Sequence, residues 1–136
     1  MPFRFQKISS SIINDSKSTN AVSTKTAVNS LLEKYSQLVL ILGGIAKQEN
    51  YSELIELINE KVETVVLIGD SSKVFSEQLS VPTLKIARSM EEAVGLSKSL
   101  TKKGAVVLSP ACASFDMFDD FNDRGDQFKH HVNEGS

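Results

Sequence analysis

AVVLSPACASFDMFDDFNDRGDQF, at residues 105–128, contains the clearest strand-to-helix transition in the chain. It opens with a short, apolar, β-branched run closing on Ser109, which is typical of a strand buried on both faces. Pro110 ends the strand ladder because it has no N–H to donate. Ser114 then suits a helix N-cap, with Asp116 in the first turn, where the helix dipole favours a negative charge. Such a helix start at the carboxyl end of a strand is where α/β proteins hold anionic ligands.

The composition is that of an ordinary soluble domain. The chain has 136 residues, of which 40% are hydrophobic and 24% charged, and a net charge of −2. This length suits one domain, which we expect to be a monomer. The interspersed charges form neither a basic stripe for nucleic acid nor a polybasic run for a membrane surface. The single Cys112 fits a reducing, cytoplasmic setting.

No stretch of the sequence predicts membrane insertion or secretion. The longest apolar run, at residues 38–42, is far shorter than the roughly 18 residues that a membrane helix needs. The N-terminal MPFRFQKI has no apolar core of the kind that a secretory signal contains.

Hydrophobic periodicity predicts a hairpin followed by alternating helices and strands. Residues 3–8 and 12–13 are typical of two short strands around a turn at residues 9–11. We expect helices at residues 23–35, 52–62, 72–79 and 89–103, and strands at residues 37–42, 64–68, 83–86 and 105–109. This alternation is typical of a mostly parallel sheet with helices on both faces. The sequence therefore predicts a Rossmann-like α/β domain with an N-terminal β-hairpin.

The predicted helix ends rest on capping residues. Ser23 and Ser52 each suit an N-cap, and Ser89 with Glu92 matches the S-x-x-E capping box. Gly104 suits the C-cap of the helix that follows that box.

Several residues in the loops allow two interpretations from their spacing alone. Gly43 and Gly44 follow a buried strand, but they form neither a G-x-G-x-x-G nor a G-x-x-x-x-G-K-[ST] motif, so a tight turn is as good a reading as a phosphate loop. Lys47 reads as a solvated lysine unless an anionic substrate binds there. The alternation of Asp15, Lys17 and Thr19 is typical of a turn with one exposed ion pair.

The polar C-terminal region predicts no nucleophile or metal site. His130 and His131 lie in what reads as a polar tail, so neither is placed to activate Ser114. One cysteine and two tail histidines make a zinc site improbable, and Cys112 reads as a buried filler. The remaining charged residues read mainly as a solvated helix face on which the arginine can pair locally: Asp119, Asp120, Asp123, Arg124 and Asp126.

Three motifs, in order, resemble the Mur ligase family. They are NDSKSTN at residues 14–20 followed by Ser23, LILGGIAKQENYSEL at residues 40–54, and SPACASFDMF from Ser109 followed by F-x-x-RGD-x-F. They span almost the whole chain, and the likeness is strongest to the members that add D-glutamate to UDP-N-acetylmuramoyl-L-alanine. The resemblance implies the C-terminal, Rossmann-like domain, with the N-terminal and central ATP-binding domains outside this sequence.

The resemblance also implies an activity and a set of binding residues. Such a ligase uses ATP and Mg²⁺ to form an amide bond in peptidoglycan precursor synthesis, and its C-terminal domain alone is expected to be inactive. The positions that match the family's D-glutamate site are Lys17, Thr19, Lys47, Ser114, Phe115 and Phe121. Those that match its ATP site are Arg4 and Asp15, although the spacing between them is shorter than in the family. None of these is implied to be a catalytic or metal-binding residue.

Two alternatives stay open from the sequence. One is a stand-alone Rossmann-like module that binds an amino acid or a nucleotide. The other is a purely structural reading, in which Ser114 only caps a helix and Lys47 is a surface charge.

Overall fold

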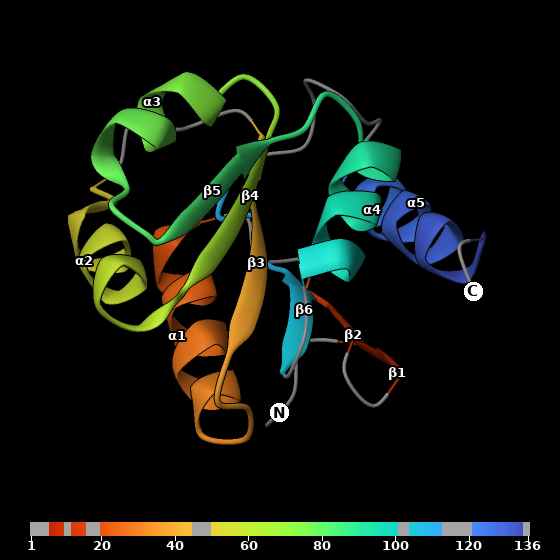
Figure 1. Cartoon of the computed structure of the whole chain (residues 1–136), viewed down its shortest axis with the longest axis horizontal. Helices are drawn as coiled ribbons and strands as arrows, with labels where there is room; N and C mark the ends of the chain where they lie inside the picture. The colour runs from red at the N-terminus through yellow and green to blue at the C-terminus, as the bar shows by residue number, and fades with distance from the viewer. Residues whose placement is uncertain are drawn as a thin grey trace.

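A six-stranded sheet forms the centre of the domain. The computed structural model describes residues 6–9, 12–15, 20–44, 50–100, 104–112 and 121–134. The strand order is β1-β2-β6-β3-β4-β5 (Figure 1). The strands are β1 (Gln6–Ser9), β2 (Ile12–Asn14), β3 (Leu38–Gly43), β4 (Thr64–Ile68), β5 (Thr83–Ile86) and β6 (Ala105–Leu108). β1 and β2 pair antiparallel, and the other four neighbouring pairs are parallel. The predicted hairpin and the mostly parallel sheet are therefore confirmed.

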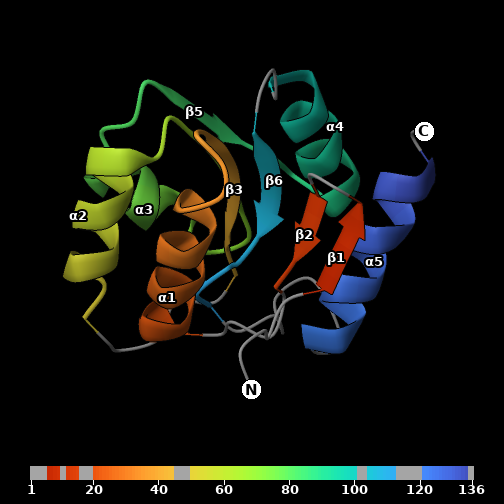
Figure 2. The same cartoon turned by 90° about the horizontal axis from the view of Figure 1, so that it is seen from below.

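Helices cover both faces of this sheet, as predicted. α1 (Ala21–Leu32), α2 (Ser52–Lys61) and α3 (Ser72–Gln78) lie on one face. α4 (Met90–Leu100) and α5 (Phe121–Glu134) lie side by side on the other (Figures 1 and 2). None of the described helices is long and apolar enough to cross a lipid bilayer.

The central strands are apolar on both faces, and their side chains alternate between two cores. Leu40, Leu42 and Val65 pack with α1, α2 and α3, whereas Ile41 and Val66 pack with α4 and α5. Because successive side chains of a strand point to opposite faces, a continuous apolar run is what a doubly covered strand requires. All six residues of β3 are buried, which explains why its position was predictable from the sequence.

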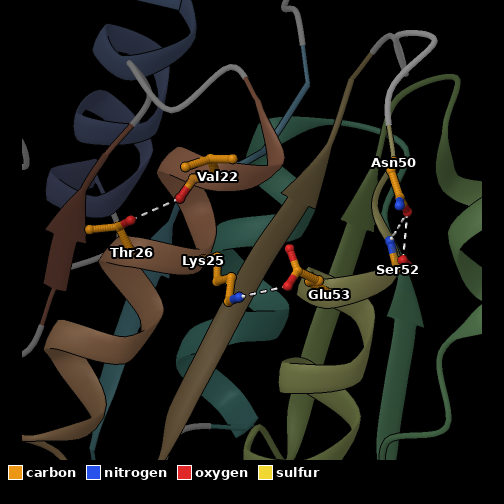
Figure 3. A network of polar contacts seen from close by, with 6 residues as sticks. All are labelled: Val22, Lys25, Thr26, Asn50, Ser52 and Glu53. Carbon is orange, nitrogen blue, oxygen red and sulfur yellow. Dashed lines mark hydrogen bonds and ion pairs between the residues drawn. The ribbon is translucent and has the colours of Figure 1, made fainter.

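Two of the predicted N-caps are wrong. α1 starts after Asn20, whose side chain accepts a hydrogen bond from the Ser23 backbone N–H at 2.9 Å, so Ser23 is already inside the helix. At α2 the side chain of Asn50 accepts from both the backbone N–H and the hydroxyl of Ser52 (Figure 3). Asn20 is therefore the N-cap of α1, whereas the N-cap position of α2 is Tyr51, whose side chain makes no capping bond.

The predicted capping box is confirmed, with one difference. The hydroxyl of Ser89 accepts from the Glu92 backbone N–H at 3.1 Å, and the Glu92 carboxylate accepts from the N–H of Arg88 rather than from Ser89 itself. The predicted extension of this helix to residues 102–103 lies outside the described residues.

The polar tail predicted for His130 and His131 is wrong, because both lie in α5. Phe128 and Val132, four residues apart, are buried in the core on the α4 side. The Lys98 ammonium group of α4 also donates to the Val132 carbonyl at 2.7 Å. Tertiary packing therefore holds a helix whose sequence is mostly polar.

Candidate functional site

Asp15 follows β2 and lies at the carboxyl end of the sheet. Its backbone N–H donates to the Leu108 carbonyl at 2.7 Å, which extends the pairing of β2 with β6 by one residue. The residue is only 1% exposed. The reading of this position as part of an exposed ion pair in a turn is therefore wrong.

The buried Ser109 hydroxyl bonds to the Asp15 carboxylate, and Thr24 in turn bonds to Ser109. Ser109 donates its hydroxyl proton to Asp15 Oδ2 at 2.7 Å, and its carbonyl accepts from the Thr24 hydroxyl of α1 at 3.1 Å. All three residues are at most 1% exposed. A hydrogen bond to an ionised carboxylate is stronger than one between neutral groups, and burial keeps water from competing with it. β2, β6 and α1 are thus joined at one point.

Sequence reasoning missed the roles of Thr24 and Ser109. Thr24 lies among the apolar positions of α1 that face the core, and Ser109 directly follows a fully buried strand. Both positions would be apolar in a plain hydrophobic core, and a buried hydroxyl needs a hydrogen-bond partner. A polar residue at each of these core-facing positions was the sequence signal that could have predicted the buried hydrogen bonds.

The segment after β6 has a fixed backbone. The Pro110 carbonyl accepts from the Gly43 N–H at 2.9 Å, which ties this segment to the end of β3. Ala111 has φ of 66°, an uncommon value for a residue with a Cβ atom. Cys112 is fully buried, as predicted. Local strain of this kind persists only where the surrounding contacts impose it, and it is frequent at functional sites.

Arg124 is buried, although the sequence predicted it to lie on a solvated helix face. Its side chain is 0% exposed, and Nη1 donates to the Cys112 carbonyl at 2.9 Å. The prediction that it belongs to a solvated helix face is wrong, although Asp126 on the same helix is exposed. Arg124 lies one helical turn before the buried Phe128, so it shares the face of α5 that packs inward. Its guanidinium group fixes the segment that leads to Ser114.

Most of the residues in the predicted site lie outside the described part of the chain. These are Arg4, Lys17, Thr19, Lys47, Ser114 and Phe115. Phe121 begins α5, but its side chain is not described. Asp15 is the one residue of the predicted set whose side chain the structure describes.

The segments that lead to these residues do converge. Asp15 lies two residues before Lys17, Gly44 three residues before Lys47, and Cys112 two residues before Ser114. All three follow strands of the parallel part of the sheet, and carboxyl ends of parallel strands share one edge. The bonds from Asp15 to Leu108 and from Gly43 to Pro110 join the three segments directly.

The glycine at the end of β3 is required by a close approach of two strands. Gly43 has φ of 131°, and a Cβ atom there would lie 2.0 Å from the Ile68 carbonyl oxygen of β4. A residue with a Cβ atom is therefore excluded at this position, while the segment after Gly44 lies outside the described residues. Within the described ranges, no group of three or more histidine, cysteine or acidic residues could hold a metal ion.

A shallow groove between α1 and α2 is a separate surface feature. Its lining includes Lys25, Asn29 and Glu53. Lys25 and Glu53 approach to 3.6 Å across it (Figure 3), but the Glu53 side chain is 80% exposed. Exposed pairs of this kind contribute about 0–1 kcal/mol, so the pair is a surface contact rather than a built site.

The strand order and the helices on both faces of the sheet define a Rossmann-like α/β domain, with a buried polar cluster at the carboxyl ends of its strands. The family model "Mur ligase, glutamate ligase domain" matches residues 3–112. The chain therefore belongs to the Mur ligase family, as the three motifs predicted.

Individual members of the family are similar to this chain over most of its length. The chain is 47% identical over 123 residues to a UDP-N-acetylmuramoylalanine–D-glutamate ligase from Cytophaga hutchinsonii, covering 88% of this chain and 27% of the relative. It is 43% identical to the ligase of the same name from Bacteroides fragilis, covering 90% of this chain and 28% of the relative. The chain thus spans about a quarter of the length of these relatives.

A solved structure supports the fold alone. The crystal structure of a MurF ligase from Thermotoga maritima in complex with ADP superposes with a TM-score of 0.62 over 97% of this chain and 31% of that one. The sequence identity is 17%.

Proposed function

We propose that this chain is the C-terminal domain of an ATP-dependent ligase that adds D-glutamate to UDP-N-acetylmuramoyl-L-alanine in peptidoglycan precursor synthesis. The observation that carries this proposal is the 47% identity, over 88% of the chain, to a ligase of that name. The enzyme would act in the cytoplasm as a monomer. A stand-alone binding module lacks any specific observation in its favour.

The chemistry of such a ligase needs positioning more than a covalent enzyme group. ATP would phosphorylate the carboxylate of the nucleotide substrate, and the D-glutamate amine would then attack the acyl phosphate, giving an amide and releasing phosphate. This sequence has no G-x-x-x-x-G-K-[ST] loop, so the rest of the enzyme would hold the ATP phosphates. Mg²⁺ would neutralise phosphate charge there.

The domain's own part would be to hold D-glutamate. Lys47 supplies a cation, and Ser114 with the N–H groups near Phe115 supplies donors, for the two substrate carboxylates. Lys17, Thr19 and Phe121 complete the proposed pocket. The convergence of the segments leading to Lys17, Lys47 and Ser114 at one edge of the sheet supports this assignment. Fixed donors of this kind would lower the entropic cost of bringing the amine to the acyl phosphate.

The proposed ATP contacts are Arg4 and Asp15. Asp15 is 1% exposed, with one carboxylate oxygen bonded to Ser109. A direct contact with the nucleotide would therefore need a rearrangement around Asp15 when ATP binds. The buried hydrogen bond would hold the carboxylate in one orientation through that change.

Substitution of the proposed D-glutamate residues tests the site. In the full-length protein we expect Lys47→Ala and Ser114→Ala each to raise the KM for D-glutamate roughly tenfold or more, because each removes a bond to a charged carboxylate. Circular dichroism should show an unchanged fold. Lys85→Ala, on the exposed side of β5, is the matched lysine control and should leave the KM unchanged. An unchanged KM in both Lys47→Ala and Ser114→Ala would contradict the site assignment.

A further inference from the structure

Ser71 lies between two of the segments that lead to the proposed D-glutamate residues. It follows β4, directly precedes α3, and is 2% exposed. Its Oγ accepts a hydrogen bond from the Gly44 N–H at 3.2 Å, and its own backbone N–H donates to the Gly44 carbonyl at 2.9 Å. Ser71 and Gly44 therefore exchange two hydrogen bonds across the ends of β3 and β4.

The same hydroxyl oxygen also contacts the segment after β6. The Cys112 thiol donates to Ser71 Oγ across 3.9 Å, a distance suited to a weak sulfur hydrogen bond. One buried oxygen thus accepts from both Gly44 and Cys112. Gly44 has φ of 140°, a value that glycine adopts readily because it has no Cβ atom. Its backbone has many accessible conformations, and the two hydrogen bonds to Ser71 select this one.

These contacts involve residues close in sequence to both proposed substrate residues. Gly44 lies three residues before Lys47, and Cys112 lies two residues before Ser114. The hydrogen bond from Gly43 to Pro110 gives the two segments one further connection, but it lies one residue farther from Lys47. Ser71 is therefore the side chain that holds the last described residue of each segment against the other.

We propose that Ser71 is a positioning residue for a substrate that carries two carboxylates: it holds Gly44 against Cys112, and these two residues begin the segments that carry Lys47 and Ser114. This inference rests on the proposed function, which assigns Lys47 and Ser114 to D-glutamate. A substrate held at two charged groups binds well only when both partners sit at a fixed spacing. Loss of the bonds from Ser71 would free Gly44 and Cys112 from each other and so weaken substrate binding.

The neighbouring residue offers a matched control. Ser72 is also buried, at 8% exposure, and its hydroxyl has no hydrogen-bond partner in the described part of the chain. Ser71→Ala and Ser72→Ala remove the same atom from adjacent positions. Only Ser71→Ala leaves the Gly44 N–H without its acceptor.

The test compares four forms of the full-length protein: wild type, Ser71→Ala, Ser72→Ala and Lys47→Ala. We expect Ser71→Ala to raise the KM for D-glutamate roughly fivefold, with the KM for ATP changed less than about twofold, as befits the loss of one buried hydrogen bond. Ser72→Ala should match the wild type in both constants. In the 136-residue chain, amide exchange measured by NMR should be faster at Gly44 in Ser71→Ala than in Ser72→Ala.

The outcomes separate this inference from the proposed function. A raised KM in Lys47→Ala with an unchanged KM in Ser71→Ala would overturn the role of Ser71 and leave the site assignment intact. Equal increases in the KM for ATP and for D-glutamate would also overturn it, because they indicate general destabilisation. An unchanged KM in Lys47→Ala would count against the proposed site itself. Should Ser71→Ala not fold, Ser71→Cys keeps the size of the side chain with a weaker acceptor and gives the same comparison.

Discussion

Replacement of glycine by alanine is expected to have opposite effects on stability at Gly104 and Gly95. Gly104 has φ of 121°, and a Cβ atom there would lie 2.0 Å from the Gln37 carbonyl oxygen, whereas nothing lies within 4 Å of a Cβ atom at Gly95 in α4. We expect Gly104→Ala to lower the free energy of unfolding by more than about 2 kcal/mol. Gly95→Ala should raise it by about 1 kcal/mol, because alanine favours the helix.

Urea unfolding of the two variants beside the wild type measures both effects. A Gly104→Ala chain as stable as the wild type would contradict the close approach of this turn to Gln37. The C-cap predicted for Gly104 concerns a helix end that lies outside the described residues, and the structure gives a reason of its own for glycine, namely contact with a residue far away in the sequence.

Charged residues were the hardest to predict one at a time. Asp15 and Arg124 are both buried, although their local sequences are polar. Local composition carries no information on the carbonyl of Cys112 or the hydroxyl of Ser109, the partners that make burial of each charge tolerable. Cys112 was easier, because a small residue among alanines is usually buried.

At the scale of elements, the Ser89 capping box is open to a direct test. Ser89→Ala removes the acceptor for the Glu92 N–H, and we expect it to lower the free energy of unfolding by about 1 kcal/mol. Ser99→Ala is the control, because Ser99 is exposed near the other end of α4 and its hydroxyl bonds only back to Leu96 of the same helix. Thermal unfolding followed by circular dichroism compares the two. Equal stability of Ser89→Ala and wild type would show that the cap contributes nothing.

Strands were predicted more accurately than helix ends. The bounds predicted for β4 and β5 are those observed: β4 is a short apolar run, and β5 alternates polar and apolar residues. The start of α1 was placed two residues late, because Asn20 and Ser23 both suit an N-cap, whereas α2 starts at Ser52 as predicted but without Ser52 as its cap. α5 extends through a region read as a tail, because Phe128 and Val132 are too few to give a strong periodic signal.

At the scale of the whole molecule, the order of the strands brings the candidate site together. The sequence predicted a parallel sheet, and therefore an edge where carboxyl ends gather. It could not predict that β2 of the hairpin pairs with β6, which lies about ninety residues later. That pairing places Asp15 against Ser109, and it depends on contacts between distant parts of the chain.

The most direct test of the central claim is the substrate dependence of ADP release by the full-length protein. The assay contains ATP, Mg²⁺ and UDP-N-acetylmuramoyl-L-alanine, and adds either D-glutamate, L-glutamate or no amino acid. We predict ADP release with D-glutamate at a rate at least about tenfold above the L-glutamate and blank reactions, a difference of about 1.4 kcal/mol in activation free energy. Release that is the same in all three reactions, or that depends on a different amino acid, would contradict the account.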